Sequence, residues 1–208
     1  VVADAHPGYL STRIASEVAT VHGLRLLDPV QHHHAHVAAV MAEHGRTGPV
    51  LGVAFDGTGW GPDDAVWGGE FLLSDLVSYR RVGSLDYASL PGGDLAARLP
   101  WRSALGYLAG AEDVEGSGEA LDALLAGIPP QEASVATQQI RKGVNCPRAS
   151  SMGRLFDAAA ALAGVRTVSH FEGHAPMELE ALAGKGAGMD FPTMAVRELA
   201  DREVLDPR

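Results

Sequence analysis

The chain has 208 residues, 46% hydrophobic and 20% charged, with a formal net charge of −10 at pH 7. This composition can build a sizeable core in one or two units, and the acidic charge argues against a nonspecific nucleic-acid surface, which needs clustered Lys and Arg. The single cysteine, Cys146, excludes an internal disulfide, and there is no run of about 20 apolar residues to span a membrane. Without a positively charged leader before an apolar stretch, we expect a cytoplasmic protein.

Four histidines lie within five positions, in the sequence HHHAH at residues 32–36. The alanine-rich stretch that follows favours a helix. In a helix His32 and His36 lie on one face, close enough for two neutral imidazoles to bind one cation, whereas His33 and His34 would point elsewhere. The HxxxH spacing alone is ambiguous, because solvent-facing or core histidines can have the same spacing.

An apolar run at residues 50–55 predicts a buried strand that ends at Asp56. The carboxylate of Asp56 could complete a metal site with the two histidines. Glycines follow at alternate positions, and Gly57 and Gly59 would let backbone N–H groups approach a phosphate. An ordinary hairpin would show the same sequence, so the two interpretations do not exclude each other.

The short connections in this part of the chain predict an antiparallel meander. Its turn at residues 57–61 is expected to face a cleft. A mainly helical region is expected over residues 94–200. The three predicted strands are residues 50–56, 65–74 and 76–83.

Residues 149–164 combine a serine cap, a helical apolar stripe and a glycine stop, and the helix is expected to begin at Ser150 or Ser151. Gly153 and Asp157 lie four apart on a flank of the stripe. A missing side chain and a carboxylate there could admit a sugar and bind its hydroxyls. Both residues are also commonplace in helices that bind nothing.

Seven segments occur in a fixed order over residues 1 to about 195. They are DAHPGYLST (4–12), the histidine cluster (32–36), FDGTGWG (55–61), VWGGEFLL (66–73), LPGGDLAARLPWR (90–102), NCPRASSMGRLFDA (145–158) and FEGHAPMELEALA (171–183). Together they resemble the hydrogenase maturation carbamoyltransferase family HypF, most specifically at the histidine cluster and at SSMGRLFDA.

The resemblance implies an α/β fold, part of the two-lobed actin/hexokinase-like (ASKHA) fold. That fold is shared with antibiotic O-carbamoyltransferases and with tRNA threonylcarbamoyl-transfer proteins. Residues 1–46 would end the first lobe, and residues 47–208 would begin the second with the predicted meander and helical region. The chain is then expected to be a fragment of a larger protein and inactive alone, because a further metal carboxylate and a second nucleotide loop would lie elsewhere.

The resemblance also implies a reaction. The family transfers a carbamoyl group from carbamoyl-adenylate, made from carbamoyl phosphate and ATP, to the C-terminal cysteine of HypE, on the way to the cyanide ligand of [NiFe]-hydrogenase. The acceptor protein supplies the thiol, so Cys146 is expected to be structural, and no catalytic residue is expected beyond the metal site. The alternatives are a noncatalytic nucleotide-binding or interaction module of the same fold, or an O-carbamoyltransferase that acts on a small molecule.

The resemblance assigns residues to a metal and a nucleotide. Two histidines and a carboxylate suit iron(II) and zinc equally, so the ligand set does not choose between them. His174 stands where glutamine would be expected, in the nucleoside wall. The implied metal ligands are His32, His36 and Asp56; the implied nucleotide contacts are Gly57 and Gly59 at the phosphate or carbamoyl end, Gly153 and Asp157 at the ribose, and Gly173 and Glu178 near the nucleoside.

Overall fold

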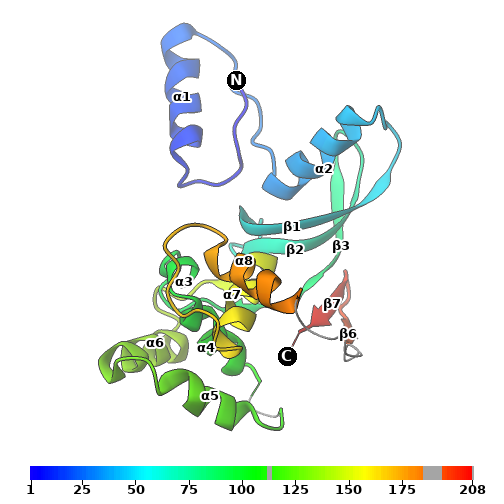
Figure 1. The fold of residues 1–208 in the computed structure, drawn as a ribbon. Coiled ribbons are helices and arrows are strands. Elements are labelled where there is room, and N and C mark those ends of the chain that lie inside the picture. Colours follow the sequence, from blue (N-terminus) through cyan, green and yellow to red (C-terminus); the bar gives the residue numbers. More distant parts are fainter. Residues whose placement is uncertain (112–113, 185–193, 208) are drawn as a thin grey trace.

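The computed structural model describes residues 1–111, 114–184 and 194–207, and it has a mixed α/β architecture (Figure 1). The helices are α1 (Leu10–His22), α2 (His32–Glu43), α3 (Leu95–Arg98), α4 (Pro100–Leu108), α5 (Ser117–Leu125), α6 (Pro130–Lys142), α7 (Met152–Leu162) and α8 (His174–Ala183). The strands are β1 (Val50–Trp60), β2 (Val66–Ser74), β3 (Tyr79–Leu85), β4 (Ala88–Ser89), β5 (Arg148–Ala149), β6 (Ala195–Glu198) and β7 (Glu203–Asp206).

Strands β1, β2 and β3 form the predicted antiparallel meander. The predicted turn at residues 57–61 is wrong, because β1 continues to Trp60 and the chain reverses over residues 61–65. The glycine-rich segment instead forms a bulge, where the pairing with β2 shifts between Phe55 and Gly59. Opposite the bulge, a Cβ on Gly68 would lie 2.4 Å from the carbonyl oxygen of Asp56, so only glycine lets the two strands approach there.

Strand β3 begins three residues later than predicted because the chain turns first. The carboxylate of Asp75 accepts hydrogen bonds from the backbone N–H groups of Val77, at 2.8 Å, and Ser78, at 2.7 Å. This side-chain turn competes with strand pairing over residues 76–78.

The predicted helical region contains α3 to α8, but its extension to residue 200 is wrong. Strands β6 and β7 form a hairpin, and β7 pairs in parallel with β3, with Val204 opposite Ser84. Pairing between segments so far apart leaves no local periodicity for a sequence pattern to reveal. Residues 112–113 and 185–193 of the predicted region lie outside the described part of the chain.

Helix α2 covers one face of the meander. Its buried residues Val37 and Met41 pack with Trp67 and Leu72 of β2. A Cβ on Gly52 would lie 2.4 Å from Val37 Cγ2, so the glycine allows the helix to sit close to β1. The alternate β1 residues Leu51, Val53 and Phe55 are exposed.

The second core lies among the helices below the sheet in Figure 1. Trp101 and Leu105 of α4 pack there with Ala158 and Ala161 of α7. Helix α7 begins as predicted, because the Ser151 side chain caps it by accepting from the backbone N–H of Arg154.

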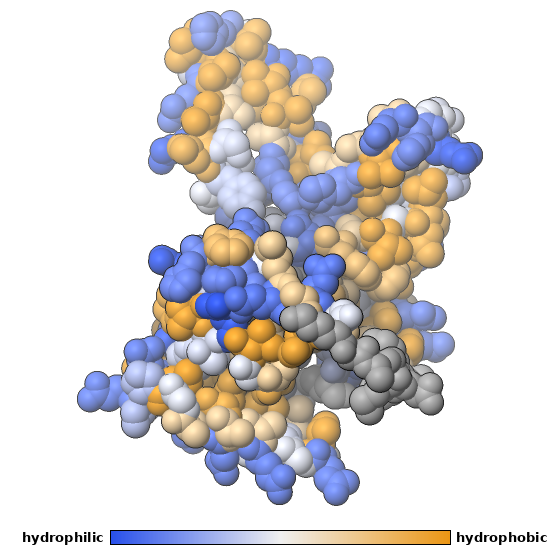
Figure 2. Space-filling model, in the orientation of Figure 1, coloured by the Kyte–Doolittle hydropathy of each residue, from blue (hydrophilic) through white to orange (hydrophobic). Residues whose placement is uncertain are grey.

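Helix α1 lies apart from α3 to α8, at the upper left of Figure 1. Leu10, Ile14, Val18 and Val21 form an exposed stripe along it, and Figure 2 shows apolar surface over this helix. None of the helices in the described residues is long and apolar enough to cross a membrane.

Candidate metal centre and adjoining cavity

The structure brings His32, His36 and Asp56 together. One ligand atom from each lies within 4.8 Å of the other two. The Nε2 atom of His32 is 3.0 Å from Asp56 Oδ2 and 3.1 Å from His36 Nε2, and His36 Nε2 is 3.7 Å from the same carboxylate oxygen. Helix α2 supplies both imidazoles and the bulge of β1 supplies the carboxylate.

The spacing of these atoms fits a small divalent cation. Ligand atoms about 2.0 to 2.1 Å from a tetrahedral zinc ion would be about 3.3 Å apart, and the observed separations of 3.0, 3.1 and 3.7 Å bracket that value. Asp56 Oδ2 is buried without a hydrogen-bond partner among the described residues, which is costly unless a cation or proton meets it. The donor set therefore fits zinc or iron(II); that it holds a metal stays a prediction.

The other ring nitrogen of His32 is held by a carboxylate. Its Nδ1 atom lies 2.7 Å from Asp4 Oδ2. Asp4 forms an isolated parallel bridge with Val30, which places the start of the chain beside the start of α2.

The prediction that His33 points away from the site is wrong, whereas His34 points away from it as predicted. The His33 ring is fully buried, and its Nε2 atom lies 3.7 Å from Asp56 Oδ2. The Gln31 amide oxygen accepts from the N–H of His34, so its nitrogen is the donor that faces His33 Nδ1 at 3.1 Å. The neutral ring therefore carries its proton on Nε2, toward Asp56.

Burial keeps the His33 ring neutral. Desolvation lowers its pKa to about 4, although the nearby charge of Asp56 acts in the opposite direction. His34 instead directs its Nε2 atom to the carbonyl oxygen of Asp75, at 2.9 Å, away from the metal centre.

The start of α7 is docked on the bulge of β1. The Ser151 hydroxyl donates to the carbonyl oxygen of Gly57 at 2.8 Å. A Cβ on Gly153 would lie 2.8 Å from Gly57 Cα, so the two backbones are in close contact at these glycines. Gly153 is thus required for packing, and Gly59 is required by His33, whose Cε1 would lie 2.3 Å from a Cβ at residue 59.

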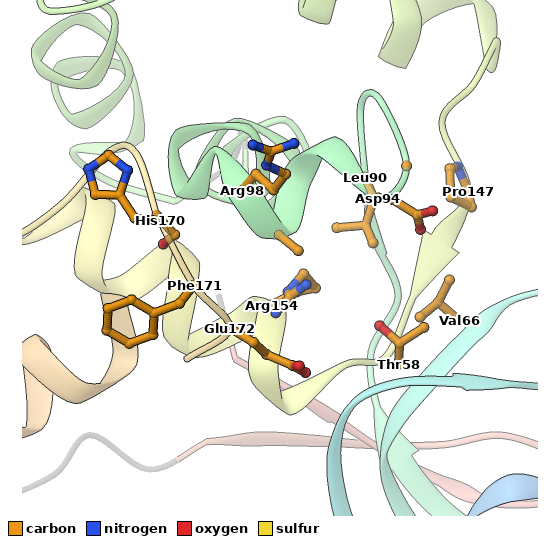
Figure 3. A pocket seen from close by; sticks show the side chains of 13 residues that line it. Thr58, Val66, Leu90, Asp94, Arg98, Pro147, Arg154, His170, Phe171 and Glu172 are labelled. Atoms are coloured by element: carbon orange, nitrogen blue, oxygen red, sulfur yellow. The ribbon is translucent and has the colours of Figure 1, made fainter. Parts of the chain in front are cut away.

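A cavity of about 440 Å³ adjoins the bulge (Figure 3). Thr58 and Val66 line it from the strands, and Phe171 and Glu172 line it from the loop before α8, with Arg154 between the two sides. The full lining is Thr58, Val66, Leu90, Gly93, Asp94, Ala97, Arg98, Pro147, Arg154, Ser169, His170, Phe171 and Glu172. Thr58 is two residues from Asp56, so the bulge connects the metal centre with this cavity.

Asp157 is buried beside Arg154 rather than on the cavity wall. Its Oδ2 atom lies 2.8 Å from Arg154 Nε. Burial raises the pKa of the Asp157 carboxyl to about 6, and the attraction of the Arg154 guanidinium only partly offsets this effect. The carboxylate can therefore accept hydrogen bonds at neutral pH, and Arg154 links it to the cavity.

The two residues predicted near the nucleoside lie just beyond the cavity. Gly173 has φ 77° and is the N-cap of α8, next to the lining residue Glu172. Both carboxylate oxygens of Glu178 accept from Arg166, at 2.5 and 2.6 Å, which lowers the pKa of Glu178. The ring of His174 stacks on that of Phe171, with centroids 4.2 Å apart. His174, which stands where glutamine is expected, therefore packs against a residue of the cavity wall.

Sequence reasoning missed four residues of this region. Asp4, His33, Arg154 and Glu172 lie within the segments that carry the family resemblance, but their pattern predicts no role for them at the site. The spacing of HHHAH points to the i, i+4 pair and gives no sign that the intervening ring faces the same carboxylate. Spacing gives no signal for Asp4 either, because it reaches His32 through a contact between segments far apart in the sequence.

Family models match nearly the whole chain. Residues 52–208 match the second subdomain of a carbamoyltransferase Kae1-like domain, and residues 1–43 match the HypF Kae1-like domain. The predicted boundary between residues 46 and 47 falls between the two matches; its assignment to two lobes stays a prediction. The class defined by the fold, the site and these matches is the Kae1-like carbamoyltransferase domain.

Sequence comparison with curated relatives identifies the family within this class. The chain is 47% identical over 180 residues to carbamoyltransferase HypF2 of Cupriavidus necator, covering 86% of this chain and 21% of that protein. It is 45% identical over 182 residues to carbamoyltransferase HypF of Rhizobium leguminosarum bv. viciae, covering 86% of this chain and 22% of the relative. The chain belongs to the HypF carbamoyltransferase family, and it spans about a fifth of the length of these curated relatives.

Solved structures agree with this conclusion. A crystal structure of full-length HypF in the phosphate- and nucleotide-bound form superposes with a TM-score of 0.88 at 40% identity, covering 100% of this chain and 26% of that one. The structure of T. kodakarensis HypF gives a TM-score of 0.85 at 36% identity, covering 99% of this chain and 27% of that one. The fold is therefore that of the corresponding part of HypF.

Proposed function

We propose that this chain forms the metal- and nucleotide-binding part of a carbamoyl-transfer site in hydrogenase maturation. The site would take the carbamoyl group of carbamoyl-adenylate and pass it to the C-terminal cysteine of a HypE-like acceptor protein. The observation that carries the proposal is the convergence of His32, His36 and Asp56 next to the cavity lined by Arg154. Family membership supports the same reaction, and the two-lobed ASKHA arrangement is part of the proposal.

The proposed transfer conserves atoms and electrons. The acceptor thiolate forms a bond to the carbamoyl carbon, the bond from that carbon to the adenylate phosphate oxygen breaks, and AMP leaves with the electron pair. A divalent cation, zinc or iron(II), held by His32, His36 and Asp56 would polarise the carbamoyl oxygen and offset the charge on the phosphate. The acceptor supplies the thiol, so no nucleophile is needed from this chain.

The residues around the cavity would bind and orient the nucleotide. Gly57 and Gly59 belong to the bulge between the metal centre and the cavity, where the phosphate or carbamoyl end would lie. Asp157 would accept ribose hydroxyls, and Arg154 would have to turn aside to expose it, because Arg154 lines the cavity and pairs with that carboxylate. That a full-length HypF has been solved in a phosphate- and nucleotide-bound form agrees with the proposal of a nucleotide site.

The transfer can be tested in the full-length protein that carries this chain. Carbamoyl phosphate, ATP and the acceptor are supplied, and the mass of the acceptor is measured. Asp56→Asn should abolish carbamoylation, whereas His34→Gln, a change on the same helix outside the metal centre, should retain it. An acceptor whose terminal cysteine is replaced by serine is the control, and undiminished transfer by Asp56→Asn would refute the proposed role of the metal centre.

A second measurement separates the two carboxylates. One charge-assisted hydrogen bond to a buried carboxylate contributes roughly 1.5 to 3 kcal/mol. The loss of even one such bond in Asp157→Ala should weaken carbamoyl-adenylate binding by about one to two orders of magnitude. Bound metal should stay unchanged. Loss of metal with unaltered nucleotide affinity would show that the roles of Asp56 and Asp157 are reversed.

A further inference from the structure

The carboxylate of Asp4 lies between two hydrogen-bond partners that use different oxygens. Its Oδ1 atom accepts from the backbone N–H of His6 at 2.7 Å, and its Oδ2 atom lies 2.7 Å from His32 Nδ1. The side chains of Asp4 and His32 are 18% and 25% exposed, so water competes only weakly for this contact. Each oxygen of the Asp4 carboxylate therefore has a protein partner.

The backbone around Asp4 is fixed from both sides. The N–H of Ala5 donates to the carbonyl oxygen of Val30 at 2.9 Å, and the N–H of Val30 donates to that of Ala3 at 3.0 Å. The Thr12 hydroxyl also donates to the carbonyl oxygen of Asp4, at 3.2 Å. These bonds hold the carboxylate in place relative to the first turn of α2, which begins two residues after Val30.

The hydrogen bond determines which nitrogen of His32 is available to a cation. A carboxylate can only accept, so the neutral His32 ring must carry its proton on Nδ1. The lone pair then lies on Nε2, which faces Asp56 Oδ2 at 3.0 Å and His36 Nε2 at 3.1 Å. Two atoms with lone pairs directed at each other at 3.0 Å repel unless a cation or proton lies between them.

We infer that Asp4 is a positioning residue for the metal centre, which fixes the tautomer and the ring orientation of His32. This inference rests on the metal centre of the proposed function. A carboxylate that accepts from the far nitrogen of a metal-binding histidine also makes the ring a stronger ligand. Asp4 thereby makes the first residues of the chain part of a site whose ligands come from α2 and β1.

The variant Asp4→Asn tests the inference because it preserves shape and reverses one hydrogen-bond role. The amide oxygen can still accept from the N–H of His6, which leaves the amide NH₂ facing His32 Nδ1. The ring must then move its proton to Nε2 or rotate, and both changes oppose cation binding. Zinc affinity should fall by about 10- to 100-fold, the usual loss for such outer partners.

The measurement is zinc affinity by chelator competition in the full-length protein, with the melting temperature of the metal-free protein recorded alongside. The double variant His32→Ala/His36→Ala defines the zinc bound elsewhere. Asp28→Asn, the same substitution at an exposed position of the loop before α2, is the matched control and should keep the wild-type affinity.

The outcomes are distinguishable. Wild-type affinity in Asp4→Asn would overturn the inference and leave the metal centre intact. Equal zinc binding by the wild type and the double variant would overturn the metal centre, and the inference with it. If Asp4→Asn lowers the melting temperature of the metal-free protein, the variant Asp4→Glu is needed, because it restores a carboxylate acceptor. The role of Asp4 would be refuted if Asp4→Glu bound zinc no more tightly than Asp4→Asn.

Discussion

The His33 imidazole occupies the space that a side chain at residue 59 would need. A Cβ on Gly59 would lie 2.3 Å from His33 Cε1 and 2.9 Å from His33 Nε2. Gly59 is thus matched to a fully buried ring whose Nε2 faces Asp56. The packing of this strand and the geometry of the proposed metal centre therefore depend on the same contact.

Gly59→Ala should destabilise the fold and disturb the metal centre. The ring of His33 has no free space to move into, so we expect a loss of about 1 to 3 kcal/mol, as for overpacked cores, with reduced zinc binding. Gly57→Ala is the matched control, because the nearest atoms to its Cβ would be Arg154 Nη2 and Glu172 Oε1, each at 3.8 Å. Urea unfolding of both variants checks this; equal stability would contradict the packing argument.

A bound cation should stabilise the fold by linking α2 to β1. At a free zinc concentration about 100-fold above its dissociation constant, a ligand that binds only the folded state adds about 2.7 kcal/mol. His36→Ala should remove the zinc-dependent rise in melting temperature at little cost to the metal-free protein, because this side chain is 59% exposed. His44→Ala, an exposed histidine just after α2, should keep it. An unchanged rise in His36→Ala would exclude it as a ligand.

The buried pair of Glu70 and Arg81 should be important for stability. Glu70 is fully buried, with Oε2 2.6 Å from Arg81 Nε, and its Oε1 accepts from the Ser150 hydroxyl at 2.6 Å. Removal of one partner leaves a buried charge, so Glu70→Gln should cost about 3 to 5 kcal/mol. Arg80→Gln, at the exposed neighbouring position, should change stability by less than about 0.5 kcal/mol. The free energy of unfolding in urea measures both.

The stability of the chain should depend on pH through Asp157. Burial raises the pKa of its carboxyl to about 6 from 3.8, so protonation favours the folded state. This contribution is complete below pH 3.8 and is lost as the pH rises through 6. Relative to Asp157→Asn, which does not titrate, the wild type should lose about 2 kcal/mol between pH 4 and 7. A difference between the two proteins that is independent of pH would contradict the raised pKa.

Local patterns predicted the elements that local forces determine. Helix α2 and its i, i+4 histidine pair follow from residues within one segment, and the start of α7 at Ser151 follows from side-chain capping. The antiparallel pairing of β1 with β2 follows from a short connection between two apolar runs. These same features brought Asp56 next to the two histidines.

Features that depend on contacts between distant segments were not predicted. The bulge in β1 depends on the close approach of Gly68 and Ser151, and no local signal distinguishes it from a turn. The direction of His33 depends on the missing side chain at Gly59, and Asp4 is brought to His32 by its bridge with Val30. The site is therefore only partly encoded in spacing, and tertiary contacts determine the rest.

The solvent-facing side of β1 affects how the isolated chain would behave in concentrated solution. Leu51, Val53 and Phe55 are 62%, 51% and 59% exposed, and among the described residues β1 pairs only with β2. An unpaired strand edge with apolar side chains can template pairing with another molecule. The net charge of −10 opposes such contacts at low ionic strength, and added salt would screen that repulsion. Purified alone, the 208-residue chain is expected to self-associate as salt is raised, and a lysine at Val53 should delay that onset.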